Sequence, residues 1–371
     1  MKTPQPPFAC KTVLGLGAAS LDYLATVDAF PQPDAKIRTT EFAVSGGGNA
    51  ANTLTALQRL GVQTRLVAKL GEDLIGSSTL AELQAEGIDT RYVQVRRGMV
   101  SPFTYVIVDS QSATRTCIHT PASEEVLAEE VLGDDQGEAL LQGVDLLHLD
   151  SRSTLAAIAL ARRAKARGIP IVLDVEKPRP HAEALLPLAD YIVTNATYPL
   201  QFGSSPGQPG ARRLFATNGM MAMLEAGPAR WVISTQGKNG SVMVRNVHPA
   251  EAQHTAVNGV PVMVTHGTAP SSSDCLQCDP RYDMLQCPAW PLSASERIVD
   301  TTGAGDAYIG GAIFGLLHGY APEKLMALAS FLAARKLTGW GARSALPTWR
   351  DLPEALLPTG AGSAATAPSQ R

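Results

Sequence analysis

The run from Asp300 to Tyr308 has residue types and spacing that could do chemistry. Gly303, Ala304 and Gly305 are small enough for successive backbone N–H groups to turn inward together at a helix start. Such a turn binds anions, and the helix dipole strengthens the binding. Asp306 follows directly and could accept a proton from a hydroxyl aimed at a bound phosphate, so the run predicts phosphoryl transfer. The alternative is a plain loop–helix junction, with Asp306 in the first turn for its favourable charge alone.

A second run, from Ser45 to Asn52, contains three consecutive glycines followed by two asparagines. The glycines allow a ligand to approach the backbone closely. Asn49 and Asn52 are three positions apart, which places both on one face of a helix. Their amides can donate to and accept from sugar hydroxyls. A helix start capped by Asn49 explains part of the pattern, but not the second asparagine in the first turn.

Short apolar runs alternate with helical patterns along most of the chain, which is typical of a parallel sheet with helices on both faces. Residues 11–17 predict a buried strand, and 49–60 predict a helix that ends at a glycine. The remaining expected strands are 64–70, 144–149, 171–175, 191–194 and 231–235, and the remaining expected helices are 77–86, 154–167, 182–188, 303–317 and 322–338.

Other segments interrupt this alternation. Residues 31–45 and 100–121, with an exposed strand at 36–44 and a hairpin around 109–113, predict a small β-rich lid at the edge of the sheet. Residues 247–297 have no long periodic pattern and are expected to be an irregular insertion. The kinase-like domain would then span 12–345, followed by a disordered tail over 346–371.

Composition excludes several classes of protein. The chain has 371 residues, 45% of them hydrophobic, which is enough for a large core and excludes a disordered chain. A net charge of −3 argues against a nucleic-acid partner or an anionic membrane partner. No apolar stretch is long enough to span a membrane, and no signal peptide is visible. Five cysteines fit a reducing compartment, so the expected location is cytoplasmic, with an organelle not excluded.

At the two motifs the chain resembles the PfkB, or ribokinase-like, family of carbohydrate kinases. GGGNAANTLTALQRLG is similar to the family's N-terminal signature, and DTTGAGDAYIGG is similar to its C-terminal signature. The resemblance covers about 12–345 apart from the insertion, and it implies a three-layer α/β/α ribokinase-like fold. A narrower resemblance, to ketohexokinases and a plant-type sugar kinase branch, rests on Asp22, Asp34, Arg38, Arg115-Thr116 and the stretch 174–179.

The resemblance implies an ATP-dependent sugar kinase that uses Mg²⁺, with K⁺ as an additional candidate cation. It makes Asp306 the general base and Gly303, Ala304 and Gly305 the anion hole. Arg115 would reach over the sugar and the phosphates. The sugar would contact Asp22, Gly48, Asn49 and Asn52, with Asp34 from the lid, and the nucleotide would contact Asn195, Thr235, Gly237, Thr302, Gly303, Gly305, Ala333 and Gly341.

One stretch departs from the family pattern. Family members often carry N-x-x-E, which organises Mg²⁺ and phosphate, whereas here Asn195 is followed by Tyr198 in place of the glutamate. Glu176 could then help to hold Mg²⁺ through water, and its alternative is a surface ion pair with Lys177 or Arg179.

Three of the other assigned residues also have simpler interpretations. Asp22 could cap a turn, Asp34 could be a solvated charge, and Arg115 could be a charge at an exposed strand edge.

The sequence therefore predicts a kinase that transfers the γ-phosphate of ATP to a small sugar, a ketohexose or a pentose. A nucleoside kinase of the same fold is the alternative, although only 5% of the residues are aromatic and a nucleobase needs an apolar wall. A non-catalytic scaffold is the third possibility. The exposed lid edges also predict a homodimer through the lid strands.

Overall fold

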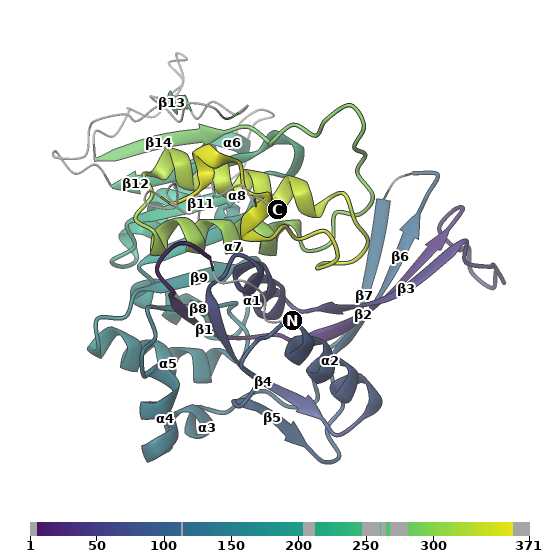
Figure 1. The fold of residues 1–371 in the computed structure, drawn as a ribbon, viewed down its shortest axis with the longest axis horizontal. Coiled ribbons are helices and arrows are strands. Elements are labelled where there is room, and N and C mark those ends of the chain that lie inside the picture. The colour runs from purple at the N-terminus through teal and green to yellow at the C-terminus, as the bar shows by residue number, and fades with distance from the viewer. Residues whose placement is uncertain are drawn as a thin grey trace, which may run out of the picture.

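The computed structural model describes residues 6–112, 114–202, 212–246, 260, 265–267 and 281–358. Within these ranges the chain forms a large sheet covered by helices, and a smaller sheet projects from its side (Figure 1). Ten strands form the large sheet: β1 (Thr12–Leu16), β4 (Gln63–Gly71), β5 (Val93–Arg96), β8 (Leu146–Leu149), β9 (Ile171–Val175), β10 (Tyr191–Asn195), β11 (Trp231–Thr235), β12 (Ser241–Asn246), β13 (Thr265–Gly267) and β14 (Tyr282–Cys287).

The large sheet is mostly parallel, which confirms the predicted fold class. Its strand order is β13-β14-β12-β11-β10-β9-β8-β1-β4-β5. Every pair from β11 to β5 is parallel, and β12, β14 and β13 add antiparallel pairs at one edge. Parallel strands require crossover connections, and helices provide most of them here.

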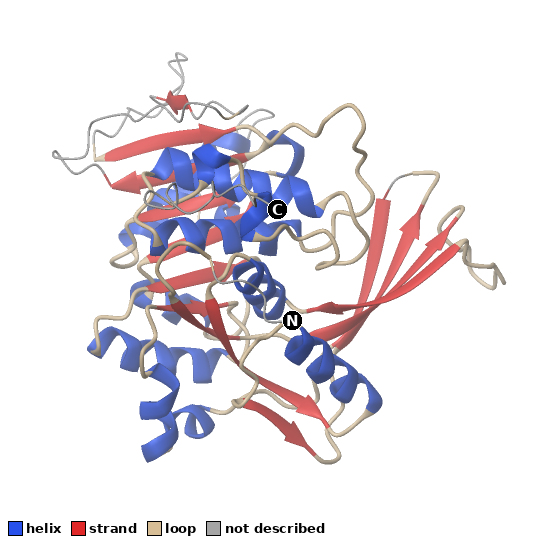
Figure 2. Ribbon diagram, in the orientation of Figure 1, coloured by secondary structure: helices blue, strands red, loops and turns tan. Residues whose placement is uncertain are grey.

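Helices cover both faces of this sheet (Figure 2). No helix in the described ranges is long and apolar enough to cross a bilayer. One face carries α1 (Asn49–Arg59), α7 (Ala304–Leu317) and α8 (Pro322–Lys336), and the other carries α3 (Ala128–Leu132), α4 (Asp134–Leu141), α5 (Thr154–Ala166) and α6 (Arg212–Glu225). The remaining helices are α2 (Leu74–Ala85) and the 3₁₀ turns η1 (Ala182–Leu188), η2 (Tyr198–Gln201), η3 (Gly237–Asn239), η4 (Trp349–Asp351) and η5 (Glu354–Leu356).

The central strands read as unbroken apolar runs because both of their faces are buried. Consecutive side chains on a strand point to opposite faces. Val172 therefore packs in the core under α1, α7 and α8, while its neighbour Leu173 packs in the core under α5 and α6. The same division separates Val193 from Ile192 on the next strand.

The smaller sheet, called the lid sheet below, consists of β2 (Ser20–Val27), β3 (Glu41–Gly47), β6 (Phe103–Asp109) and β7 (Thr114–Thr120). Its order is β3-β2-β6-β7, with β2 and β6 parallel and the outer pairs antiparallel. The register places Asp22, Thr104 and His119 in one row across the sheet. The neighbouring row contains Tyr23 and Tyr105, so these side chains point to the opposite face.

The strand expected at 36–44 is β3, which begins later than expected, at Glu41, and ends at Gly47. Strand β2 was not expected from the sequence. Leu21 and Tyr23 lie on one face of β2, and Leu24 lies with Asp22 on the other, so both faces carry apolar residues. The usual two-residue alternation of apolar and polar residues is therefore hidden. The segment 182–188 is a 3₁₀ helix rather than an α-helix, because it contains Pro187, which lacks an N–H to donate.

The expected irregular insertion also contains regular structure, because β14 pairs with β12 across the edge of the large sheet and β13 pairs with β14. Residues 247–259, 261–264 and 268–280 lie outside the described ranges. The first part of the expected tail packs into the protein, where Leu346, Leu352 and Leu356 are buried. Residues 359–371 lie outside the described ranges.

Helix α7 packs closely against α1 and α8 because glycines face both helices. A Cβ on Gly310 would lie 2.8 Å from the Cβ of Ala56 in α1, and a Cβ on Gly311 would lie 2.7 Å from the Cα of Ala329 in α8. Larger side chains would force the helices apart. This close packing sets the start of α7, which carries Asp306, beside the start of α1, which carries Asn52.

Candidate active site

The two sequence motifs meet at a cavity of about 460 Å³. Its walls come from the lid sheet, the start of α1, the loop after β9 and the start of α7. The predicted residues that line it are Asp22, Gly48, Asn49, Asn52, Arg115, Glu176, Thr302, Gly303, Ala304, Gly305 and Asp306. The cavity therefore contains most of the residues predicted to bind the sugar and the phosphates.

The start of α7 presents unpaired backbone donors to this cavity. Gly303 adopts a φ of 75°, and a Cβ at this position would lie 2.6 Å from the Cβ of Ala342, so only glycine fits here. The N–H of Ala304 donates to the carbonyl of Thr301 at 3.3 Å. The N–H groups of Gly305 and Asp306 have no acceptor in the described chain. Two free donors at a helix start can bind an anion.

The carboxylate of Asp306 is buried in the first turn of α7. Its Oδ2 accepts a hydrogen bond from Nδ2 of Asn52 at 2.7 Å. Burial and the negative charge of Glu176 raise its pKa to about 7, although the bond from Asn52 opposes the rise. Burial also raises the pKa of Asp22 to about 6. A carboxylate with a pKa near neutrality can both accept and release a proton at ordinary pH.

Asn52 is held by an arginine that the sequence motifs do not reveal. Arg343 is 2% exposed, and its Nε donates to Oδ1 of Asn52 at 2.9 Å. Its Nη2 donates to the carbonyl of Gly47 at 2.9 Å, and its Nη1 lies 3.4 Å from a carboxylate oxygen of Glu82. Asn52 thus connects Arg343 to Asp306, and one Nδ2 hydrogen remains for a ligand. Arg343 is 291 positions from Asn52 and belongs to no recognisable motif, so no sequence signal indicates this contact.

Acidic side chains surround the amide of Asn49. Its Nδ2 lies 3.1 Å from Oδ2 of Asp174 and 3.4 Å from Oε2 of Glu176. Burial and the charges of Glu176 and Asp306 raise the pKa of Asp174 well above its ordinary value. Glu176 forms no ion pair with Lys177 or Arg179, and a Cβ on Gly305 would lie 3.9 Å from its Oε1. Glu176 therefore lies beside the start of α7.

The residue before Asn49 joins the lid sheet to α1. Gly48 has a φ of 90°, and a Cβ there would lie 2.5 Å from the carbonyl oxygen of Ala18. Only glycine can connect β3 to α1 along this path.

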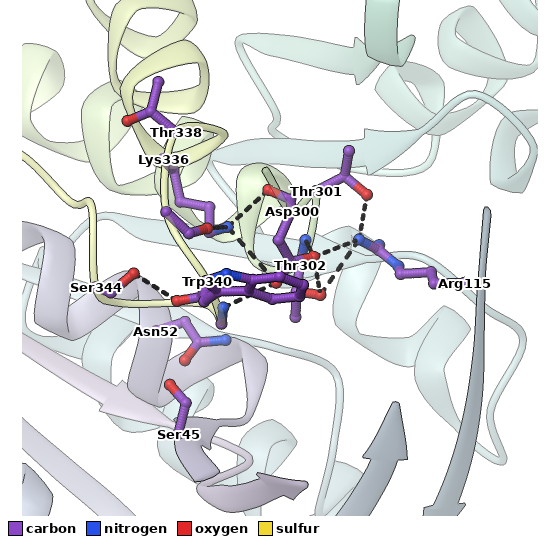
Figure 3. Close-up of polar contacts among 12 residues, drawn as sticks. Ser45, Asn52, Arg115, Asp300, Thr301, Thr302, Lys336, Thr338, Trp340 and Ser344 are labelled. Atoms are coloured by element: carbon purple, nitrogen blue, oxygen red, sulfur yellow. Dashed lines mark hydrogen bonds and ion pairs between the residues drawn. The ribbon is translucent and has the colours of Figure 1, made fainter. Parts of the chain in front are cut away.

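Arg115 extends from β7 to the loop before α7 (Figure 3). Its Nη1 donates to the hydroxyls of Thr301 and Thr302, and it lies 3.8 Å from Oδ1 of Asp300. Asp300 in turn accepts from the N–H of Thr302 at 2.9 Å. Lys336 also contacts this loop: it is buried and donates to the carbonyl of Asp300 at 2.8 Å. Burial lowers the pKa of Lys336 to about 8. Arg115 is thus exposed, but it is hydrogen-bonded to the loop before α7 and is not a free charge at a strand edge.

Six predicted residues lie outside the cavity, and most have structural contacts of their own. Asp34 is exposed in a lid loop with a φ of 62°. Oδ1 of Asn195 accepts from the N–H groups of Thr197 and Tyr198, which closes the turn after β10. The other four are Thr235, which donates to the carbonyl of Thr194, Gly237 in a turn with a φ of 57°, Ala333 packed against the core, and Gly341, which donates to Asp300.

Tyr198, where family members often carry glutamate, does not face the cavity. It is 3% exposed, packs in the core under α5 and α6, and contacts the ring of Phe202. The residue has thus become part of the core. Among the described residues, no group of three or more His, Cys, Asp or Glu side chains is arranged to hold a metal ion.

Residues 11–268 and 286–349 match the family described as pfkB family carbohydrate kinase. The chain belongs to this family. As a pfkB kinase it is a phosphotransferase with an alcohol group as acceptor. The family match covers both motifs and the strands and helices that position them.

Named proteins similar to this pfkB kinase include a ribokinase from Haemophilus influenzae, 23% identical over 93% of this chain and 98% of the relative. A mouse ketohexokinase is 21% identical over 88% of this chain and 96% of its own length. A ribokinase and a ketohexokinase thus match at similarly low identity. The comparisons therefore support the family but do not specifically support its ketohexokinase and plant-type branch.

Solved structures share the fold of this pfkB kinase. Arabidopsis thaliana ribokinase complexed with ribose and ATP has a TM-score of 0.68 at 19% identity, covering 92% of this chain and 97% of that one. A Burkholderia thailandensis nucleoside kinase in complex with inosine has a TM-score of 0.64 at 19% identity, covering 91% and 94%.

Replacing Arg343 by methionine is expected to lower the free energy of unfolding by about 3 kcal/mol. The buried oxygens of Asn52 and Gly47 would each lose a charged donor. Chemical denaturation measures the change, and the matched control is Arg162→Met, because Arg162 is exposed on α5. Equal unfolding midpoints for the two variants would contradict a structural role for Arg343.

Proposed function

We propose that this protein transfers the γ-phosphate of ATP to a hydroxyl group of a small sugar, with Asp306 as general base. The observation that carries the proposal is the pairing of a buried carboxylate with free N–H groups of the same helix turn. A hydroxyl beside Asp306 and a phosphate on the turn would place the reacting groups together. The family assignment supports a sugar hydroxyl as the acceptor.

In the proposed reaction, the sugar oxygen attacks the γ-phosphorus while the bond from that phosphorus to the bridging oxygen of ADP breaks. The hydroxyl proton passes to Asp306 at Oδ1, because Oδ2 already accepts from Asn52. The N–H groups of Gly305 and Asp306 and the guanidinium of Arg115 stabilise negative charge on the transferred group. Lid closure would exclude water, which would otherwise accept the phosphate.

The sugar would lie against Asp22, Gly48, Asn49 and Asn52, all of which line the cavity. His119 carries the one aromatic ring among the residues that line the cavity, which include no phenylalanine, tyrosine or tryptophan, so a nucleobase would find little aromatic surface there. This favours a sugar over a nucleoside. Asp34 lies outside the cavity and would reach the sugar only if its loop moved.

ATP would extend from Thr302, Gly303 and Gly305 toward the ends of β11 and α8. This places the nucleotide near the predicted residues Asn195, Thr235, Gly237, Ala333 and Gly341.

Mg²⁺ would neutralise phosphate charge, and Glu176 would hold it through water. The donor set fits, because Mg²⁺ keeps most of its ligands as water and phosphate oxygens and needs only one or two carboxylates. K⁺ remains a family expectation, and replacing it with Na⁺ in the assay tests it.

Asp306→Asn is expected to lower turnover by about 10²–10⁴-fold, because the amide cannot accept the hydroxyl proton. ADP release is measured with Mg-ATP and a panel of ketohexoses, pentoses and nucleosides, with EDTA as the metal control. Binding of the sugar to the variant, measured by calorimetry, is expected to persist.

The matched control for this variant is Asp28→Asn, since Asp28 is exposed in the lid. Wild-type turnover by Asp306→Asn would contradict the assignment of the base. Nucleotide binding without ADP release from any acceptor would favour the scaffold.

The pH profile of kcat/KM is expected to rise with pH to a midpoint near the Asp306 pKa of about 7, because the base must be ionised. Glu176→Gln removes a negative charge that raises this pKa, so the rise is expected at lower pH. The control Glu183→Gln, at an exposed position of η1, should leave the midpoint unchanged. A midpoint that stays fixed in Glu176→Gln would rule out Asp306 as the titrating group.

The proposal includes a homodimer through the lid sheet. The outer face of the sheet carries Val44, Tyr23, Tyr105 and Ile118 in one row, and three of these side chains are about half exposed. Light scattering is expected to give twice the mass of one chain, and Ile118→Glu should convert the protein to monomers. A wild-type mass of one chain would contradict the dimer.

A further inference from the structure

We infer that the acceptor sugar carries an anionic group, a phosphate or a carboxylate, which is bound by Arg152, Lys177 and Arg179. This inference rests on the proposed kinase function and specifies its substrate class. All three side chains line the 460 Å³ cavity that contains Asp306.

A second cavity of about 150 Å³ adjoins this wall. Both cavities are lined by Ala18, His119, Arg152 and Arg179, so they share one boundary. No residue from 300–306 lines the smaller cavity. Arg152 and Arg179 therefore face space that extends away from the anion-binding start of α7.

Among the residues that the structure describes, the three cationic side chains have no carboxylate partner. No hydrogen bond or ion pair of their charged groups is formed within the described chain. The Nε of Arg179 is buried and has no acceptor. By contrast, Lys69, which also lines the smaller cavity, is paired with Glu130 at 2.9 Å and with Glu124 at 3.7 Å.

The positive charges are also close enough to act on one another. Burial lowers the pKa of His119, and the charges of Arg152, Arg179 and Lys177 lower it further. Burial likewise lowers the pKa of Arg179, followed by the charge of Arg152. Arg152 and Arg179 are partly buried, whereas Lys177 is exposed. Like charges without partners are costly where they are partly buried, and a bound anion would remove that cost.

Carboxylates also line these cavities: Glu124 and Glu125 line the smaller one, where both are exposed, and Glu176 lines the larger one. Among the described residues, none of the three forms an ion pair with the cations. Asp150 is buried, and its oxygens accept from the backbone N–H groups of Ala18, Ala50 and Arg152. Asp174 is buried as well and accepts from Asn49. Both acids attract the cations, but neither forms an ion pair with them.

Guanidinium groups suit this task because they bind phosphate or carboxylate oxygens through two parallel N–H bonds. The phosphates of ATP have other donors, namely Arg115 and the start of α7. The anionic group of the acceptor would then lie at one end of the cavity, with the reacting hydroxyl beside Asp306. The product would carry negative charge at both ends.

The first test uses inorganic phosphate as the probe, titrated by calorimetry into the full chain without nucleotide. Arg152→Gln and Arg179→Gln are each expected to weaken its binding by about tenfold or more. The matched control Arg162→Gln, at an exposed position of α5, should bind as the wild type does. Absent binding to the wild type, or equal binding to all four proteins, would overturn the inference.

The second test measures ADP release with neutral sugars and their anionic counterparts, such as fructose with its 1- and 6-phosphates, ribose with its 5-phosphate, and glucose with gluconate. The anionic member is expected to have the higher kcat/KM. The two arginine variants should raise KM for that acceptor while KM for ATP stays unchanged. The phosphate and carboxylate arms show which anion is bound.

The outcomes separate this inference from the kinase proposal. Turnover that is faster with neutral sugars would overturn the anionic acceptor and leave the kinase function in place. A rise in KM for ATP alone would assign the cations to the nucleotide phosphates and would also overturn it. Phosphate binding that depends on Arg152 and Arg179, without ADP release from any acceptor, would support the anion site and contradict the kinase function.

Discussion

A hydrogen bond of 2.7 Å between Asn52 and Asp306 joins the two halves of the candidate active site. The two residues are 254 positions apart, and each belongs to the first turn of a different helix. The bond forms because α1 and α7 pack so closely that only a glycine, Gly310, fits against Ala56. Arg343 completes the arrangement by fixing the other end of the Asn52 amide. Sheet order, helix packing and the buried Arg343 thus together fix the orientation of the Asp306 carboxylate.

The electrostatics of the cavity divide it into unlike regions. The charge of Glu176 raises the pKa of both Asp174 and Asp306, and the charge of Asp306 raises that of Asp174 further. Arg152 and Arg179 line the same cavity where it adjoins the smaller one. A ligand with hydroxyls at one end and negative charge at the other would match both regions. The small net charge of the whole chain conceals this local separation.

The sequence predicts the parts of this structure that depend on local pattern. Small residues at 303–305 indicated the anion-binding turn, and the buried run at 11–17 indicated β1. Strand β2 was not predicted because both of its faces are partly covered. Arg343 and the cationic group of Arg152 and Arg179 were not identified as site residues, because their importance comes from neighbours distant in sequence. The proposed contacts of Thr235 and Ala333 with the nucleotide come from family resemblance alone, and the cavity around Asp306 does not extend to these two residues.

The short connection between β3 and α1 has a mechanical consequence. Only Gly48 separates the end of the lid sheet at Gly47 from the start of the helix at Asn49. Any tilt of the lid sheet must therefore be absorbed by rotation at this glycine or be carried into the helix. The same helix holds Asn52 and, through it, Asp306. A tilt of the lid sheet that Gly48 does not absorb would therefore move α1 and, with it, the proposed base.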